Sequence, residues 1–81
     1  MQLSIYSLKK ILFDGEIESV NCQTRNGEIT VLNHHRPLVS MLKTGTVKIL
    51  DASKKEHFIP VKNGFLEVGS GNRAKLIVEE S

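Results

Sequence analysis

Residues 20–31 read VNCQTRNGEITV, and this stretch has the pattern of two β-strands joined by a tight turn. Val20 and Cys22 alternate with polar residues before the turn, and Ile29 and Val31 alternate with polar residues after it. Successive side chains of a strand point to opposite faces, so each alternating pair can reach one common core. An Asn-Gly dipeptide separates the two segments and is a strong turn signal. The stretch therefore predicts a β-hairpin with one buried face.

The same alternation recurs along the whole chain. Four further segments carry apolar pairs two residues apart: Leu3 and Ile5, Val47 and Ile49, Leu66 and Val68, and Leu76 and Val78. Turn signals separate the segments at Asp14-Gly15, Asn26-Gly27, Thr44-Gly45, Asn63-Gly64 and Gly71-Asn72. Helical spacing is confined to residues 3–12, LSIYSLKKIL, which fit two consecutive strands equally well. We therefore predict an all-β fold for one domain over residues 1–81: a small antiparallel β-sandwich of about nine or ten short strands.

The composition limits the range of functions. Eleven Lys and Arg stand against nine Asp and Glu in 81 residues, which gives a net charge of +2. The positive residues are scattered in small groups, and this is weak support for a nucleic-acid partner. A single cysteine, Cys22, forms no intrachain disulfide and suits a reducing, cytosolic compartment. Two lysines interrupt the apolar N-terminal residues, so we expect neither a signal peptide nor direct insertion into a membrane.

Residues 31–42, VLNHHRPLVSML, contain the strongest candidate for chemistry. On an extended segment His34 and His35 point to opposite faces, and no further ligands lie at a suitable spacing, so we expect no metal site. Acid-base catalysis needs an oriented partner and a pocket, and a sandwich of this size has little room for a pocket. We therefore expect no catalytic residue and no cofactor site, and we interpret the segment as a surface that docks a partner.

Two other patterns have structural interpretations. The stretch VGSGNRA, residues 68–74, resembles a dinucleotide fingerprint, but a strand-like run follows where that fingerprint needs a helix, so we predict a hairpin turn. A barrel that binds single-stranded nucleic acid needs exposed aromatic side chains in a basic groove. The four aromatic residues are Tyr6, Phe13, Phe58 and Phe65, and they suffice only to fill the core. A freestanding ligand- or nucleic-acid-binding sandwich and a small hydrolase remain as alternatives to docking.

Four short motifs occur in order: Phe13-Asp14-Gly15-Glu16, Gly27-Glu28, His35-Arg36-Pro37-Leu38 and Asn63-Gly64-Phe65-Leu66-Glu67-Val68. Together they resemble the β-sandwich domain of the epsilon subunit of F-type ATP synthases, over essentially the whole chain. No motif is specific alone, but four in register with matching intervals argue against chance.

Two features depart from the family pattern. Members commonly have Pro-Gly where this chain has Asn33-His34, and often a glycine where it has Thr30. If position 34 takes a positive φ, histidine tolerates it at some cost. Many members also continue into a C-terminal helical hairpin, which these 81 residues do not include. The ending Glu79-Glu80-Ser81 mildly favours a naturally short protein, but a longer chain remains an alternative.

The resemblance implies a mechanical role. In the family, the sandwich is a non-catalytic rotor subunit of the central stalk that links the gamma subunit to the membrane c-ring and couples ion-driven rotation to ATP synthesis. A close-packed sandwich suits the transmission of torque because its interior resists deformation. By this resemblance, we expect a protein that is monomeric when isolated. It would act at the cytoplasmic face of the bacterial inner membrane, as a peripheral part of the complex.

Residue by residue, the resemblance assigns two contact surfaces. Glu28, Thr30 and His35 would face the c-ring. The residues that would face gamma are Ser7, Pro37, Leu38, Val39, Ser40, Met41 and Leu42. The four large apolar residues among them supply more apolar surface than one strand face needs. The sequence leaves open which of the four belong to the core and which to an interface. Exposed charged contacts are each worth about 1 kcal/mol or less, so shape and apolar burial must also contribute.

Overall fold

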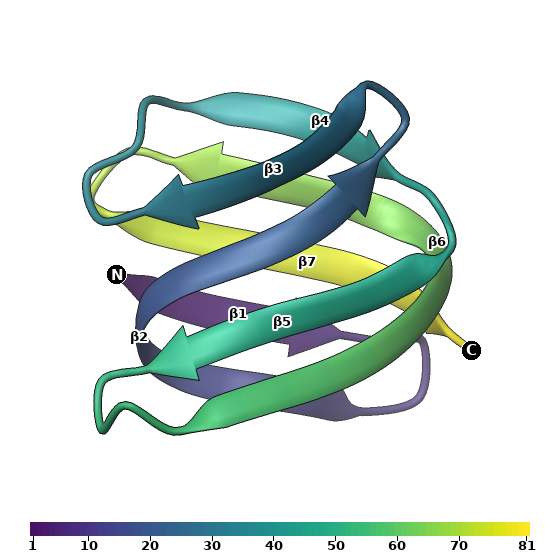
Figure 1. The fold of residues 1–81 in the computed structure, drawn as a ribbon, viewed down its shortest axis with the longest axis horizontal. Coiled ribbons are helices and arrows are strands. Elements are labelled where there is room, and N and C mark those ends of the chain that lie inside the picture. The colour runs from purple at the N-terminus through teal and green to yellow at the C-terminus, as the bar shows by residue number, and fades with distance from the viewer.

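The computed structural model describes all residues 1–81 and contains seven strands and no helix (Figure 1). The strands are β1 (Gln2–Tyr6), β2 (Ile11–Thr24), β3 (Gly27–Leu32), β4 (Leu38–Leu42), β5 (Gly45–Asp51), β6 (Glu56–Gly69) and β7 (Arg73–Glu80). The predicted all-β class is therefore confirmed. Because no element is helical, the structure has no apolar helix of membrane-spanning length.

The strands form two packed layers (Figure 1). One layer has the order β4-β6-β7-β1, and the other has the order β3-β2-β5-β6. The two longest strands, β2 and β6, bend and contribute to both layers. Every pairing is antiparallel except that of β1 with β7, which is parallel. At the top of Figure 1, β3 and β4 form the edges of their layers, and they carry most of the residues assigned to contact surfaces.

The structure has seven strands, where the sequence predicted nine or ten, because two predicted turns lie inside long strands. One of them, Asp14-Gly15, lies within β2. The Oδ1 atom of Asp14 accepts hydrogen bonds from the side chains of Gln2 (2.8 Å) and Ser4 (3.2 Å) on the neighbouring β1. These cross-strand bonds hold the dipeptide extended, so the turn prediction was wrong at this position.

The second wrongly predicted turn, Asn63-Gly64, lies within β6. The register of β6 against β7 shifts between Val61 and Asn63, which marks a β-bulge. Gly64 has a φ of +149°, and a Cβ atom at this position would collide with the carbonyl oxygen of Ile77 on β7. The glycine therefore serves the close approach of two strands and does not reverse the chain.

The hairpin predicted from residues 20–31 is confirmed. Strands β2 and β3 pair from Thr24 and Gly27 outward, around the two-residue loop Arg25-Asn26. The buried hydroxyl of Thr24 donates to the carbonyl oxygen of Gly27 at 2.6 Å and accepts the N–H of Asn26 at 3.1 Å. Gly27 has a φ of +115°, which favours glycine. Two other predicted turns, Thr44-Gly45 and Gly71-Asn72, also join strands as expected.

One hydrophobic core fills the space between the layers. Its sixteen members are Met1, Leu3, Ile5, Ile17, Val20, Cys22, Val31, Leu42, Val47, Ile49, Val61, Leu66, Val68, Ala74, Leu76 and Val78. Every alternating position named from the sequence is buried except Ile29, which is half-buried. The expectation that the aromatic residues fill the core was wrong, because none of the four is buried and Phe58 is 59% exposed. Aliphatic side chains from two facing sheets are enough to fill a layer of this thickness.

Candidate docking surfaces

Strand β4 separates its apolar residues onto two faces. Leu38 packs against the core, and Leu42 is inside it with 1% of its surface exposed. Val39 and Met41 point outward and are 69% and 49% exposed. This corrects the assignment of Leu42 to a contact surface, because its side chain is not available to a partner. Among the four large apolar residues of the segment, Val39 and Met41 are exposed, Leu38 is half-buried and Leu42 is buried.

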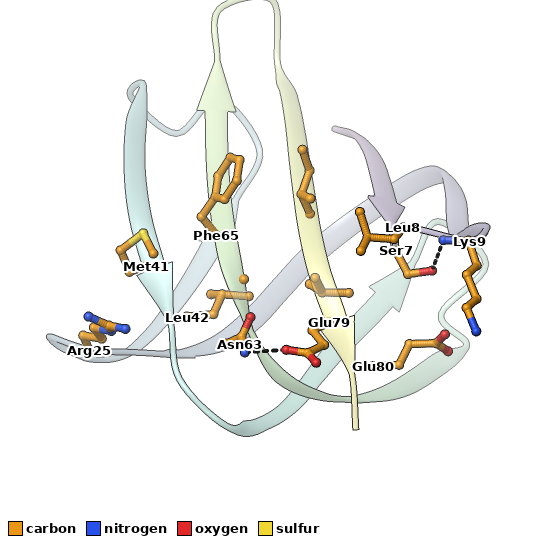
Figure 2. Close-up of a pocket in the computed structure, with 13 residues that line it drawn as sticks. Ser7, Leu8, Lys9, Arg25, Met41, Leu42, Asn63, Phe65, Glu79 and Glu80 are labelled. Carbon is orange, nitrogen blue, oxygen red and sulfur yellow. Dashed lines mark hydrogen bonds between the residues drawn. The ribbon is translucent and has the colours of Figure 1, made fainter.

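Met41 begins an apolar row that crosses the outer face of β4, β6 and β7. It lies directly opposite Phe65 on β6, and Phe65 lies directly opposite Ile77 on β7. Leu8, at the turn between β1 and β2, is fully exposed on the far side of this row (Figure 2). This face therefore carries four of the seven exposed large apolar side chains of the protein: Leu8, Val39, Met41 and Ile77.

The apolar row borders a groove of about 810 Å³. Met41, Phe65 and Leu8 supply apolar walls, and charged residues stand around them (Figure 2). The charged residues are Lys9, Arg25, Glu79 and Glu80. An apolar centre with a polar rim is the usual anatomy of a protein–protein interface.

Ser7 shapes this surface from within the turn between β1 and β2. Its Oγ atom accepts the backbone N–H groups of Lys9 at 3.3 Å and Lys10 at 3.2 Å. Its own backbone N–H donates to the carbonyl oxygen of Lys10 at 2.9 Å. These bonds close the turn and leave Leu8 at its exposed tip.

Three residues of this face were not among the predicted site residues: Leu8, Phe65 and Ile77. The signal for two of them was present in the alternation, because Phe65 adjoins the buried Leu66 and Ile77 lies between two buried positions. Leu8 had no such signal, because its exposure depends on the path of a turn.

Glu28 and Thr30, both assigned to the c-ring-facing surface, are exposed on the outer face of β3, in the other layer. The Oγ1 atom of Thr30 accepts a hydrogen bond from Nδ2 of Asn21 on β2 at 2.9 Å. Strand β3 pairs only with β2, so its other edge carries no partner strand. His35 lies beyond the opposite end of β3 from Glu28, in the loop to β4. The three residues therefore lie at separate places along β3 and the loop that follows it, and they do not form a cluster.

Hydrogen bonds hold the exposed loop that carries His35. The N–H of His35 donates to the carbonyl oxygen of Leu32 at 3.3 Å, and the N–H of His34 donates to Oδ1 of Asn72 at 2.7 Å. The Nδ1 atom of His35 lies 2.7 Å from the carbonyl oxygen of Arg36. His34 has a φ of +63°, which confirms the positive φ considered for this position.

Outside these surfaces lie other side chains of the types that bind a metal or act as a nucleophile. No group of three or more His, Cys, Asp or Glu side chains lies together in a way that could hold a metal ion. Cys22 is buried in the core as predicted, and burial raises the pKa of its thiol to about 12. A thiol in this environment is a poor nucleophile because its thiolate form is disfavoured.

One histidine–carboxylate pair stabilises the turn between β5 and β6. Nε2 of His57 lies 2.8 Å from Oδ2 of Asp51, and Oδ1 of Asp51 accepts the N–H groups of Ser53 (2.8 Å) and Lys55 (3.0 Å). The hydrogen bond with His57, followed by those from the backbone, lowers the pKa of Asp51. The His57 ring packs edge-on against Phe13 at 5.1 Å. The pair therefore helps to close the turn between β5 and β6.

The exposed Phe58 lies beside Lys48. The Nζ atom of Lys48 lies 5.9 Å from the centre of the Phe58 ring, and it also pairs with Glu56 at 3.4 Å. A single aromatic side chain beside a lysine that already has a carboxylate partner differs from the basic, aromatic groove of single-strand binders.

An aliphatic core between two packed layers of strands defines a small β-sandwich domain. Residues 1–81 match the family described as ATP synthase, delta/epsilon chain, beta-sandwich domain. The chain belongs to this family.

Similar proteins agree with this assignment. The ATP synthase epsilon chain of Chlorobaculum tepidum is 41% identical over 78 residues, which cover 96% of this chain and 88% of that protein. The ATP synthase epsilon chain of Bordetella avium is 36% identical over 72 residues, which cover 89% of this chain and 51% of that protein. The resemblance inferred from four short motifs is therefore confirmed.

Two solved structures share the fold. A chain of the Euglena gracilis mitochondrial ATP synthase matches with a TM-score of 0.89 at 20% identity, over 96% of this chain and 49% of that chain. A chain in the central stalk and c-ring structure of the Tetrahymena thermophila mitochondrial ATP synthase matches with a TM-score of 0.82 at 17% identity, over 99% of this chain and 63% of that chain. The present chain thus spans about half of the first protein and less than two thirds of the second.

Proposed function

We propose that this chain is a non-catalytic rotor subunit of the ATP synthase central stalk. In this role it links the gamma subunit to the c-ring and couples ion-driven rotation to ATP synthesis. Family membership supports the general role. The observation that carries the specific role is the difference between the two outer faces of the sandwich. The β4-β6-β7 face carries four of the seven exposed large apolar side chains, whereas the outer face of β3 carries Glu28 and Thr30 and a single exposed apolar residue, Leu32.

The apolar face is the surface that we assign to gamma. Val39 and Met41 extend outward from β4, and Phe65, Ile77 and Leu8 continue the apolar area beyond it. Burial of apolar area is the main source of affinity at such surfaces, and a few central side chains dominate it. The other residues assigned to this surface support it: Ser7 closes the turn that displays Leu8, Leu38 packs against the core, and Pro37 and Ser40 flank the exposed positions of β4.

The outer face of β3 is the surface that we assign to the c-ring. Glu28, Thr30 and His35 are exposed and polar, which suits a partner that presents polar groups of its own. Each exposed charge contributes about 1 kcal/mol or less to such a contact, and salt screens it. The contact therefore depends on several groups along β3 and on their geometry.

The compact dimensions and the packing of the sandwich suit a mechanical connector. The body measures 26 × 24 × 19 Å and has a single core of 16 residues. A close-packed interior transmits strain because it has low compressibility. In the proposed role the chain is a peripheral part of the membrane-bound complex, on the cytoplasmic face of a bacterial inner membrane, and it is monomeric when free.

Variants on the two faces test the proposal by separating the two partners. Met41→Asp should weaken binding to purified gamma subunit and leave binding to the detergent-solubilised c-ring unchanged. Glu28→Arg should do the reverse. Phe58→Ser is the control. It removes an exposed apolar side chain that lies outside both surfaces, so it should leave both affinities unchanged. The proposal fails if the unmodified chain binds neither partner, or if neither face variant separates the two affinities.

A further inference from the structure

Asn72, in the turn between β6 and β7, contacts the loop that carries His35. Its Oδ1 atom accepts the backbone N–H of His34 at 2.7 Å, although the two residues are 38 positions apart in the sequence. The β3–β4 and β6–β7 loops lie at the same end of the sandwich, near the N-terminus (Figure 1). A single side chain therefore joins two loops that belong to different strand pairs.

The β3–β4 loop, residues 33–37, has few other contacts that define its path. All five residues are exposed, and the one backbone hydrogen bond that closes the loop is 3.3 Å long. Oδ1 of Asn33 accepts a hydrogen bond from the amino group of Met1 at 2.6 Å. The φ of His34 is +63°, a left-handed conformation that is unfavourable for a residue with a side chain. The observed path therefore needs stabilisation from outside the loop.

Asn72 is itself held firmly enough to provide that stabilisation. Its carbonyl oxygen accepts the N–H of Gln2 at 3.1 Å, which ties it to β1. It has a φ of +58°, and Asn is one of the residue types that tolerate this region. Its Nδ2 atom lies 3.5 Å from Oδ1 of Asn33, a long contact with the same loop. The anchored backbone fixes the side chain, and the side chain contacts two consecutive loop residues.

We propose that Asn72 is a positioning residue that orders the 33–37 loop for contact with the c-ring. The identity of the partner rests on the proposed function, and the mechanism rests on the hydrogen bond to His34. Holding the His34 amide fixes the direction in which the chain continues into His35 and Arg36. When the bond is absent, the loop adopts several conformations, and only the molecules with the ordered loop can bind the c-ring. The apparent affinity then falls by that fraction.

Two substitutions at position 72 separate this role from a general structural one. Asn72→Gly keeps a residue that accepts a positive φ but removes the acceptor for the His34 N–H. Asn72→Asp keeps both the tolerance for positive φ and an oxygen in the same place. A titration of c-ring binding at two ionic strengths separates the effect of the added charge of Asp from the effect of the hydrogen bond. Thermal unfolding of both variants shows whether the domain still folds.

Hydrogen exchange of the His34 amide and binding to the c-ring and to gamma provide the readouts. In Asn72→Gly, we expect faster exchange at His34 and c-ring binding weaker by about threefold to fivefold, since one hydrogen bond is worth about 1 kcal/mol. Binding to gamma should change less than about twofold, because only Pro37 of the loop belongs to that surface, and the pairing of β4 with β6 holds Val39 and Met41 in place. Asn72→Asp should restore most of the slow exchange and of the c-ring affinity, because it keeps the acceptor for the His34 N–H and loses only the long contact with Asn33.

The inference and the proposed function can fail separately. If the unmodified chain binds the c-ring and Asn72→Gly binds it equally well, Asn72 does not position the contact and the inference is overturned. The same conclusion follows if gamma binding falls as much as c-ring binding, because the role is then a general structural one. If the unmodified chain does not bind the c-ring at all, the proposed function is overturned, and the inference about that contact falls with it.

Discussion

Met41 of β4 and Phe65 of β6 lie directly opposite each other, and both side chains point away from the core into the same groove. The next residue in each strand, Leu42 and Leu66, is buried. Adjacent positions of one strand therefore have different tasks, since one side chain stabilises the fold and its neighbour is available to a partner.

Alanine substitutions at positions 41 and 42 should show this difference. Leu42→Ala leaves a cavity in the core and should lower the free energy of unfolding by about 2–5 kcal/mol. Met41→Ala should lower it by less than about 1 kcal/mol, but should weaken gamma binding by about tenfold, because it removes a central apolar contact. Urea unfolding and titration with gamma measure the two effects. A loss of stability in Met41→Ala as large as that in Leu42→Ala would show that Met41 is structural.

The stability losses in a series of three glycine-to-alanine substitutions should follow the backbone geometry at each position. Gly64→Ala should lower the free energy of unfolding by about 3 kcal/mol or more, because the new methyl group collides with the carbonyl oxygen of Ile77 and φ is +149°. Gly71→Ala has open space but a φ of +76°, so we expect a loss of about 1–2 kcal/mol.

The third substitution of this series is its internal control. Gly69→Ala has neither a nearby atom nor a positive φ, so its effect should stay within about 0.5 kcal/mol. Thermal unfolding of the three variants gives the order. Equal stabilities for Gly64→Ala and Gly69→Ala would mean that β6 and β7 separate there at little cost.

The effect of a substitution at His34 on the free energy of unfolding should depend more on how well the new residue accepts a positive φ than on loss of the imidazole ring. His34→Gly relieves the strain of a φ of +63° but adds conformational entropy to the unfolded chain, so the free energy of unfolding should change by less than about 1 kcal/mol. His34→Val places a β-branched residue in the same conformation and should cost about 1–2 kcal/mol. Both variants keep the N–H that Asn72 accepts. Chemical denaturation of the pair is the measurement, and equal stabilities would contradict the assigned backbone conformation.

The stability of the β5–β6 turn should depend on acid pH through Asp51. The hydrogen bond with His57, together with backbone N–H groups, holds the pKa of Asp51 below its usual range. A carboxyl group with a lower pKa in the folded state stabilises the fold above its unfolded pKa, and this contribution is lost as the pH falls through the folded value. Denaturation between about pH 5 and pH 2 should therefore show a steeper loss for the unmodified chain than for Asp51→Asn. Parallel curves would exclude this contribution.

Cys22 should react only when the domain opens. Burial in the core and a pKa of about 12 leave almost no accessible thiolate at neutral pH. The rate of labelling by iodoacetamide should therefore follow global unfolding, and it should rise in urea and in the destabilised Leu42→Ala variant. Rapid labelling of the folded protein, at a rate independent of urea, would contradict the position of Cys22 in the core.

The sequence by itself determined the fold class and most of the core. The period of two in segments such as VNCQTRNGEITV is a local property, because alternate side chains of any strand share a face whatever the strand pairs with. For this reason Val20, Cys22 and Val31 could be assigned to the core, and the motifs could indicate the family. The contact residues on β3 and β4 came from that resemblance, and the sequence alone did not separate Met41 from Leu42.

Only the tertiary structure decided which turn signals reverse the chain and which residues meet. Asp14-Gly15 and Asn63-Gly64 have the composition of turns, but cross-strand bonds and a close approach of strands hold them within β2 and β6. The bond between His34 and Asn72 joins residues 38 positions apart, so no local pattern contains it. Local propensities amount to about 1 kcal/mol or less per residue, and several long-range contacts together outweigh them.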